Sequence, residues 1–240
     1  MIMFDFSKDV IVVTGAAGNL GRAVVKAFLA HEGVVCALDH RHGCLAGIFA
    51  DSSAVGQLHI YEDVDVTDRE ALENLAGRIS SEVGPVNVLV NTVGGFTMGE
   101  QVHEISAETW QRMMDINVHS FLNTTAVFVP GMLKQQHGKV ISIASKAALS
   151  GGATTGIYAA AKGALLRLTE SMAAELKSHN IQVNSVLPST VDTPENRDAM
   201  PKADFSKWVT PEQVANVIMF LSSPASSGVT GAAVPIFGKS

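Results

Sequence analysis

The sequence predicts an α/β protein: a single-domain, doubly wound parallel sheet of about seven strands with helices on both faces. Two observations lead to this prediction. Short runs rich in valine and isoleucine alternate with longer amphipathic segments along the whole chain. The short runs are apolar at nearly every position, which is typical of parallel strands that are covered on both faces.

The first half of the chain supplies four of the expected strands. They are Val10–Val13, Val34–Leu38, the weaker Leu58–Glu62, and Val86–Val90. Helices are expected over Asn19–His31, from a capping box at Thr67–Glu70 to about Glu82, and over Ala107–Phe128.

The second half continues the alternation. Strands are expected at Lys139–Ile143, Gln182–Leu187 and Ala232–Ile236, and an alanine- and leucine-rich helix at Tyr158–Lys177. Another helix begins at Thr210–Gln213, with proline at its first position and a glutamine able to reach back to the cap. Ser189–Val209 has no strong periodicity and is expected to form a substrate-binding loop or lid.

Composition excludes several classes of protein. Lysine and arginine total 17 and aspartate and glutamate 23, a net charge of −6, so no broad basic surface for nucleic acid is expected. With 47% hydrophobic and 17% charged residues, the chain is too apolar to be disordered. Its 240 residues fit one large domain, and we expect residues 1–240 to form one dinucleotide-binding catalytic unit.

The sequence also indicates neither a membrane protein nor a secreted one. No apolar run approaches the roughly 18 residues that cross a bilayer, and Met1–Phe6 has no basic segment and no cleavage site. Cys36 and Cys44 are too few for a disulfide framework and are expected as reduced thiols in the cytoplasm. The imidazoles and thiol of His40–Cys44 favour a surface loop over a metal site, so no metal is expected.

The first chemical motif is the glycine-rich segment Thr14–Gly21, between the first strand and the first helix. Gly15, Gly18 and Gly21 would let the backbone turn tightly and approach a pyrophosphate, which the free N–H groups of the helix N-terminus would bind. A plain turn is the alternative. The strand before it and the helix after it favour a dinucleotide site.

Asp39 ends the second expected strand, 24 residues after Gly15. A carboxylate there can accept hydrogen bonds from the adenosine ribose hydroxyls and would repel the 2′-phosphate of NADP. The sequence therefore favours NAD. Arg41 lies close enough to bind that phosphate, which keeps NADP as the alternative.

The second motif is Tyr158 with Lys162, whose i,i+4 spacing places a phenol and an ammonium on one helix face. A free tyrosine has a pKa of about 10, and lowering it to about 7 takes roughly 4 kcal/mol. The ammonium and the positive ring of an oxidised nicotinamide would favour the phenolate. A chance surface pair is the alternative, but Ser145 lies 13 residues earlier, after a strand, and Asn117 lies in the preceding helix.

Together these motifs resemble the short-chain dehydrogenase/reductase family over essentially the whole chain. The resemblance implies a Rossmann-type domain, a nicotinamide cofactor, a small-molecule substrate, and a homodimer or homotetramer. It implies that Tyr158 is the acid–base, that Ser145 holds the substrate oxygen, and that Lys162 lowers the pKa of Tyr158 and binds the ribose. Asn117 would anchor a water that links Lys162 to solvent.

The resemblance also implies a set of cofactor-binding residues. Asp65–Val66 looks like the adenine-contacting pair, Asn91–Gly94 is similar to Asn-Asn-Ala-Gly, and Pro188–Thr193 resembles the segment that holds the carboxamide. The full set is Gly15, Gly18, Asn19, Leu20, Gly21, Asp39, Asp65, Val66, Asn91, Val93, Gly94, Tyr158, Lys162, Pro188, Val191 and Thr193. Gly18 stands one place early, Ser189 replaces a glycine, and Phe237 replaces an aspartate of the family pattern.

The sequence is compatible with three functions. The first is an NAD(P)-dependent oxidoreductase acting on a carbonyl or alcohol. The second follows from Lys146–Leu149, Ala161–Ala164 and Leu187–Trp208, which look like dihydropteridine reductase, an NADH-dependent enzyme with a quinonoid acceptor. Ser145 favours the first, because those reductases carry alanine there. The third is an inactive dinucleotide sensor, which predicts a damaged tyrosine, lysine or serine; all three residues are present.

Pocket residues are expected in the least patterned segments. Phe96 and Met98 follow the fourth expected strand and could line a substrate pocket or pack elsewhere. Phe205 and Trp208 could close over the substrate or pin the loop. The sequence does not identify the substrate.

Overall fold

The predicted parallel sheet is confirmed by the computed structural model, which describes residues 4–50 and 55–239. Its seven strands are all parallel and lie in the order β3-β2-β1-β4-β5-β6-β7. They are β1 (Val10–Thr14), β2 (Val34–Leu38), β3 (Gln57–Tyr61), β4 (Val88–Asn91), β5 (Gly138–Ile143), β6 (Ile181–Pro188) and β7 (Ala233–Ile236). The strand order reverses between β1 and β4, so a ligand crevice is expected at their carboxyl ends.

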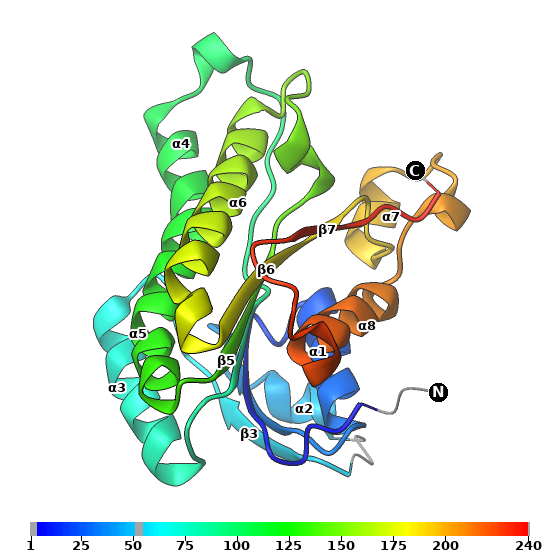
Figure 1. Ribbon diagram of the computed structural model, residues 1–240. Coiled ribbons are helices and arrows are strands. Elements are labelled where there is room, and N and C mark those ends of the chain that lie inside the picture. The colour runs from blue at the N-terminus through cyan, green and yellow to red at the C-terminus, as the bar shows by residue number, and fades with distance from the viewer. Residues whose placement is uncertain (1–3, 51–54, 240) are drawn as a thin grey trace.

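Helices cover both faces of this sheet (Figure 1). One face carries α1 (Asn19–Leu29), α2 (Leu45–Phe49) and α8 (Pro211–Ser222). The other carries α3 (Arg69–Glu82), α4 (Ala107–Met114), α5 (Ser120–Gln135) and α6 (Gly156–Leu176). The short α7 (Pro194–Ala199) lies beyond the end of β6, close to the C-terminal segment.

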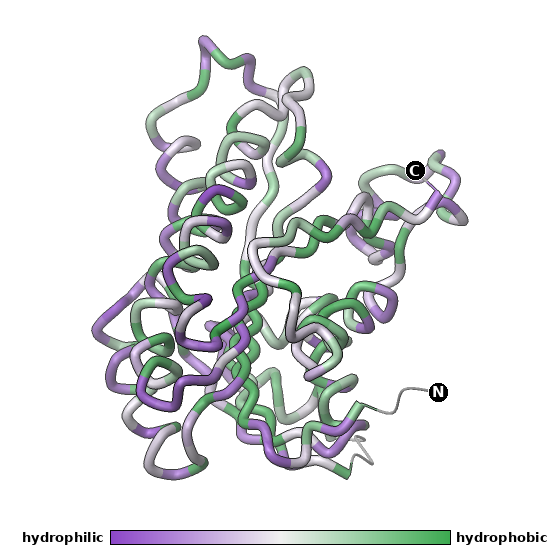
Figure 2. The backbone as a smooth tube through the Cα atoms, viewed as in Figure 1, coloured by the Kyte–Doolittle hydropathy of each residue, from purple (hydrophilic) through white to green (hydrophobic). Residues whose placement is uncertain are grey.

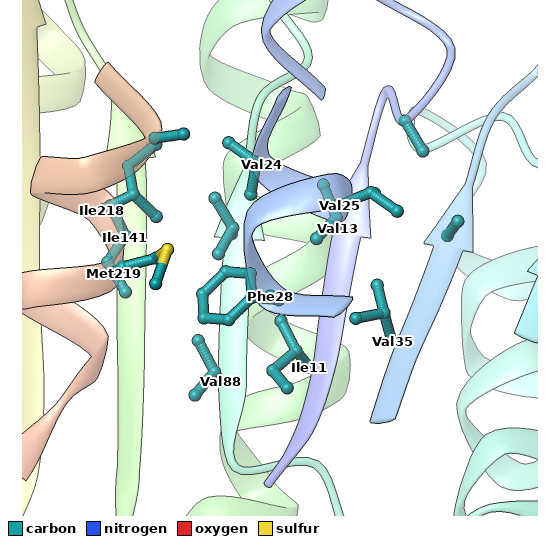
Figure 3. Close-up of a cluster of buried hydrophobic side chains, with 14 of the residues drawn as sticks. Ile11, Val13, Val24, Val25, Phe28, Val35, Val88, Ile141, Ile218 and Met219 are labelled. Atoms are coloured by element: carbon teal, nitrogen blue, oxygen red, sulfur yellow. The ribbon is translucent and has the colours of Figure 1, made fainter. Parts of the chain in front are cut away.

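Successive residues of each strand supply the two hydrophobic cores. In β1, Ile11 and Val13 face the core under α1 and α8, whereas Val10 and Val12 face the opposite one. Figure 3 shows the first core, where Phe28 of α1 lies between the sheet and α8. Figure 2 shows the apolar strands running through the centre of the molecule.

The helix expected over Ala107–Phe128 differs from the prediction. The structure has α4, then a π-type turn over Asp115–His119, then α5, which runs through Pro130 to Gln135. Burial of Val129 and Met132 against the sheet outweighs the local cost of proline. The wider turn lies at Asn117, one of the predicted site residues.

Other local predictions are corrected by hydrogen bonds. The cap of α3 is Asp68, which accepts from the Ala71 amide, and not Thr67, whose hydroxyl donates to Asp65. The capping box of α8 at Thr210 is confirmed. The helices α2 and α7 were not predicted, because five or six residues are too few to show a helical period.

Several absences concern only the described residues. None of their helices is both long and apolar enough to cross a bilayer. They contain no group of three or more histidine, cysteine or acidic side chains arranged to hold a metal. Cys36 and Cys44 are free thiols, and burial raises the pKa of Cys36 to about 12. Residues 1–3 of the Met1–Phe6 segment lie outside the description.

Candidate active site

The glycine-rich turn connects β1 to α1 at the point where the strand order reverses. Gly15 has a φ of +64°, a conformation that L side chains rarely adopt. A Cβ on Gly21 would lie 2.2 Å from the Gly15 carbonyl oxygen, so α1 packs against the turn too closely for any side chain. Gly18 is the N-cap and has no side chain to occupy the first-turn amides, which suits anion binding.

A cavity of about 620 Å³ opens beside Gly15. Five predicted cofactor residues line it together: Gly15, Asp39, Asp65, Val66 and Val93. Sequence reasoning missed the contribution of the α4 region, whose exposed polar residues carry no distinguishing signal. Glu108, Gln111, Arg112, Asp115 and Ile116 line the same cavity.

The carboxylate of Asp39 is bound to the chain itself. Its side chain is 1% exposed, and its oxygens accept from the Ala17 amide at 2.9 Å and from the Arg41 amide at 3.1 Å. The Arg41 guanidinium adds bonds of 2.9 and 3.3 Å. Burial would raise the pKa of Asp39, but these bonds outweigh it and lower the pKa. A ribose hydroxyl could reach this carboxylate only if Arg41 moved, because a carboxylate has about four acceptor sites.

The two predicted catalytic hydroxyls lie together. Tyr158 is in the first turn of α6, and Ser145 follows β5 as the cap of the 3-10 helix Lys146–Leu149. Both side chains line one cavity, and the Phe96 ring packs edge-on against Tyr158 with centroids 4.9 Å apart. Burial raises the pKa of Tyr158, and the nearby Ser145 hydroxyl opposes this shift. The expected lowering of the Tyr158 pKa by Lys162 is therefore not seen in the protein alone.

Lys162 lies behind Tyr158 and is 4% exposed. Its Nζ donates to the Ile143 carbonyl oxygen at 2.8 Å and lies 6.0 Å from the centroid of the Tyr158 ring. Burial lowers the pKa of Lys162 to about 8. The ammonium therefore contacts the ring face and a strand-end carbonyl.

Asn117 holds the backbone that follows β4. Its Oδ1 accepts from the Gly95 amide at 3.1 Å, and its Nδ2 donates to the Gly95 and Met113 carbonyls at 3.1 and 3.0 Å. A Cβ on Gly94 would lie 2.9 Å from Lys162 Nζ and 3.0 Å from Asn117 Oδ1. The π-type turn thus brings Asn117 to the same backbone position as Lys162, and a side chain at Gly94 would require one of these two groups to shift.

A second cavity, of about 630 Å³, is bordered by these catalytic candidates. Ser145, Tyr158 and Lys162 line it together with four predicted cofactor residues, Leu20, Gly94, Pro188 and Val191. Of the other pocket candidates, Phe96 lines it. Met200 and Asn196 also line it, and both belong to Ser189–Val209, the segment expected to bind substrate.

The segment expected to act as a lid is folded against the site. Asn19 of the glycine-rich turn donates to the Glu195 carboxylate of α7 at 2.7 Å. Thr193 caps α7 by accepting from the Asn196 amide and does not line the large cavities. Phe205 and Trp208 pack on each other with centroids 4.7 Å apart and do not line the second cavity.

Asn91, at the end of β4, completes the predicted set. Its Oδ1 accepts from the Thr124 hydroxyl at 2.8 Å. Its Nδ2 is buried without a hydrogen-bond partner among the described residues, as is the hydroxyl of Thr14 in the neighbouring strand. Two unpaired polar groups therefore lie beside the glycine-rich turn.

Comparisons with known proteins identify the family to which this chain is similar. The family model described as "short chain dehydrogenase" matches residues 9–204. A 3-oxoacyl-[acyl-carrier-protein] reductase of Thermotoga maritima is 30% identical over 95% of this chain and 96% of its own. A meso-2,3-butanediol dehydrogenase of Serratia marcescens is 29% identical over 97% of this chain and 94% of its own. The crystal structure of a 3-oxoacyl-[acyl-carrier protein] reductase of Brucella melitensis with bound NAD superimposes with a TM-score of 0.86, at 27% identity, over 99% of this chain and 94% of that one.

Proposed function

The chain belongs to the short chain dehydrogenase family of oxidoreductases, and we propose that it interconverts a carbonyl compound and an alcohol with a nicotinamide dinucleotide. One observation carries the proposal: the hydroxyls of Ser145 and Tyr158 line one cavity of about 630 Å³ beside the buried ammonium of Lys162. Two hydroxyls that face one cavity suit an oxygen that gains and loses charge during reaction.

The residues present fit a dinucleotide. The glycine-rich turn lies between two cavities, with Gly15 lining one and Leu20 lining the other. The first-turn amides of α1 and the closely packed Gly21 suit a pyrophosphate between them. In this arrangement Asp65 and Val66 hold the adenosine end, and Lys162 and Val191 lie at the nicotinamide end.

NAD is the preferred cofactor in this proposal. The adenosine cavity is acidic, and its four carboxylates belong to Asp39, Asp65, Glu108 and Asp115. Arg112 is the one guanidinium among its described lining residues, and Arg41 is paired with Asp39. A 2′-phosphate would bring about two further negative charges into this surface, which disfavours NADP.

A bound nicotinamide supplies the hydride for reduction or accepts it during oxidation. Ser145 donates a hydrogen bond to the carbonyl oxygen and holds it in place. Tyr158 protonates that oxygen as it gains negative charge, and in the opposite direction removes the proton from the alcohol. The raised pKa of Tyr158 keeps the phenol protonated, as reduction requires.

Lys162 and Asn117 position these groups. The Lys162 ammonium, held by the Ile143 carbonyl, stabilises negative charge on the phenol during oxidation. Asn117 fixes Gly95 through two hydrogen bonds, and the next residue, Phe96, packs on Tyr158. The orientation of the Tyr158 ring therefore depends on the π-type turn.

The test is NADH oxidation with a panel of ketones, aldehydes and quinonoid dihydropterin. We expect Tyr158→Phe to lower kcat by roughly 10²- to 10⁴-fold and Ser145→Ala by about 10²- to 10³-fold. NADH binding, followed by its fluorescence, should persist in both variants. If Tyr158→Phe kept most of the wild-type rate, the acid–base assignment would be wrong. Turnover of the dihydropterin that is independent of Ser145 would favour the quinonoid alternative.

A further inference from the structure

We propose that the substrate of this site carries an anionic group, a carboxylate or a phosphate, which Lys146 binds. This inference rests on the proposed function and specifies the substrate class. Lys146 is the residue that follows Ser145 in the chain, and it lines the same cavity. Neither the acid–base chemistry nor the cofactor site uses it.

The ammonium of Lys146 lies over an aromatic ring beside the cavity-lining residues. Its Nζ lies 5.2 Å from the centroid of the Phe237 ring, in the segment that follows β7. A cation over an aromatic face is weakly stabilised. The ring supplies no carboxylate to neutralise the charge of Lys146.

The charged residues that line this cavity are all positive. Lys146 and Lys162 are its two described charged lining residues, and no aspartate or glutamate is among them. In the described part of the chain, Lys146 takes part in none of the ion pairs. In a protein with a net charge of −6, a cavity that contains only cations is selective for anions.

The two lysines have different positions and therefore different partners. Lys162 is buried behind Tyr158 and donates to a backbone carbonyl, whereas Lys146 is an exposed residue that lines the cavity. Consecutive Cα atoms are about 3.8 Å apart, so the flexible side chain of Lys146 starts beside the residue that would hold the carbonyl oxygen. The anionic group should therefore lie within the reach of a lysine side chain from the reacting carbonyl.

Apolar groups define the rest of the substrate. Phe96, Ala147, Val191 and Met200 line the cavity and can cover a short carbon skeleton. The cavity therefore fits a small oxo acid or a phosphorylated ketone, and the corresponding hydroxy compound in the oxidation direction.

Matched substrates test the inference. Acetoacetate and levulinate are compared with their ethyl esters, and dihydroxyacetone phosphate with dihydroxyacetone, using NADH and wild-type protein. We expect kcat/KM for the anionic member to exceed that of its neutral partner by about 10- to 100-fold, mainly through KM. The oxo acids and the phosphate form separate arms, so the results also show which anion is preferred.

The variants Lys146→Met and Lys146→Arg assign that preference to the residue. We expect methionine, which keeps an apolar stem on Phe237, to remove most of the anion preference, and arginine to retain it. Lys177→Met, an exposed lysine at the far end of the 21-residue helix α6, is the matched control and should keep the wild-type preference. NADH binding confirms that every variant is folded.

The possible results distinguish failure of the role of Lys146 from failure of the proposed oxidoreductase function. Turnover that depends on Tyr158 but is equal for anionic and neutral partners overturns the role of Lys146 and leaves the proposed function intact. An anion preference that persists in Lys146→Met also overturns it. If NADH binds and no acceptor is reduced, the proposed function and this inference both fail.

Discussion

Replacing Lys162 by methionine should make the protein more stable near neutral pH while abolishing its activity. The ammonium is 4% exposed, and no described carboxylate pairs with it. Its one hydrogen bond goes to the Ile143 carbonyl oxygen. A charge buried in this way is costly to the folded state, and methionine fills a similar volume without it.

The magnitude follows from the pKa. Burial lowers the pKa of Lys162 from 10.5 to about 8, which corresponds to roughly 3 kcal/mol at pH 7. Methionine leaves the Ile143 carbonyl unpaired, which costs about 1 kcal/mol. The free energy of unfolding of Lys162→Met should therefore exceed that of the wild type by roughly 2 kcal/mol at pH 7.

The sign of the stability difference between Lys162→Met and the wild type changes with pH. Between about pH 8 and 10.5 the unfolded lysine still binds its proton while the folded lysine has lost it, so wild-type stability rises with pH in this window. Methionine does not titrate. The gap should therefore shrink above pH 8 and reverse by about 1 kcal/mol near pH 10.5, where only the lost hydrogen bond remains.

Urea unfolding of the cofactor-free wild type, Lys162→Met and Lys177→Met at pH 7 and pH 10 measures this difference. The exposed control should stay within about 0.5 kcal/mol of the wild type at both values. A Lys162→Met variant that is less stable at pH 7, or whose advantage is independent of pH, would refute the argument that the buried charge is destabilising.

Three further substitutions probe the backbone contact, the cofactor cavity and a helix cap. Gly94→Ala places a Cβ 2.9 Å from Lys162 Nζ and 3.0 Å from Asn117 Oδ1, so we expect kcat to fall by at least about 10-fold while NADH still binds; unchanged kinetics would contradict the contact. Asp39→Ser removes a carboxylate from the adenosine cavity and frees its arginine partner, so the NADPH/NADH ratio of kcat/KM should rise by about 10-fold; a ratio that stays constant would show that this pair does not select the cofactor. Thr210→Ala removes the capping hydroxyl of α8 and should cost about 1 kcal/mol of stability, or about 2–4 °C in Tm, without changing kinetics; a change in KM would be unexpected.

The sheet could be predicted because its strands are apolar on both faces, and burial dominates their conformation. Val10–Val13 was predicted and β1 is Val10–Thr14. Boundaries that depend on one hydrogen bond were less predictable. Thr67 and Asp68 are both capable caps, and the choice of Asp68 depends on Thr67 donating to Asp65. The π-type turn has no local sequence signature, since its cause is the tertiary bonding of Asn117 to Gly95.

The catalytic candidates were predictable because the i,i+4 spacing of Tyr158 and Lys162 fixes their common face, and Ser145 follows a strand. The ion pairs of the site residues could not be predicted from the sequence. Arg41 was considered as a phosphate ligand, but it is bound to Asp39, because a buried carboxylate recruits the nearest guanidinium. The residues of α4 that line the adenosine cavity come from an exposed helix face, which sequence patterning does not distinguish from ordinary surface.

Buried polar groups beneath the candidate site are hydrogen bonded to one another, whereas several of those in the site have no partner among the described residues. The hydroxyls of Ser142, Thr169 and Ser185 form a closed hydrogen-bonded group between β5, β6 and α6, so the fold satisfies them itself. At the carboxyl ends of β1 and β4, the Thr14 hydroxyl and the Asn91 amide group are buried without partners among the described residues, and the Lys162 charge is uncompensated. These groups reduce the stability of the folded chain. If the proposed function holds, these groups lie beside the reacting atoms, and the same substitution at Lys162 should raise stability and remove activity.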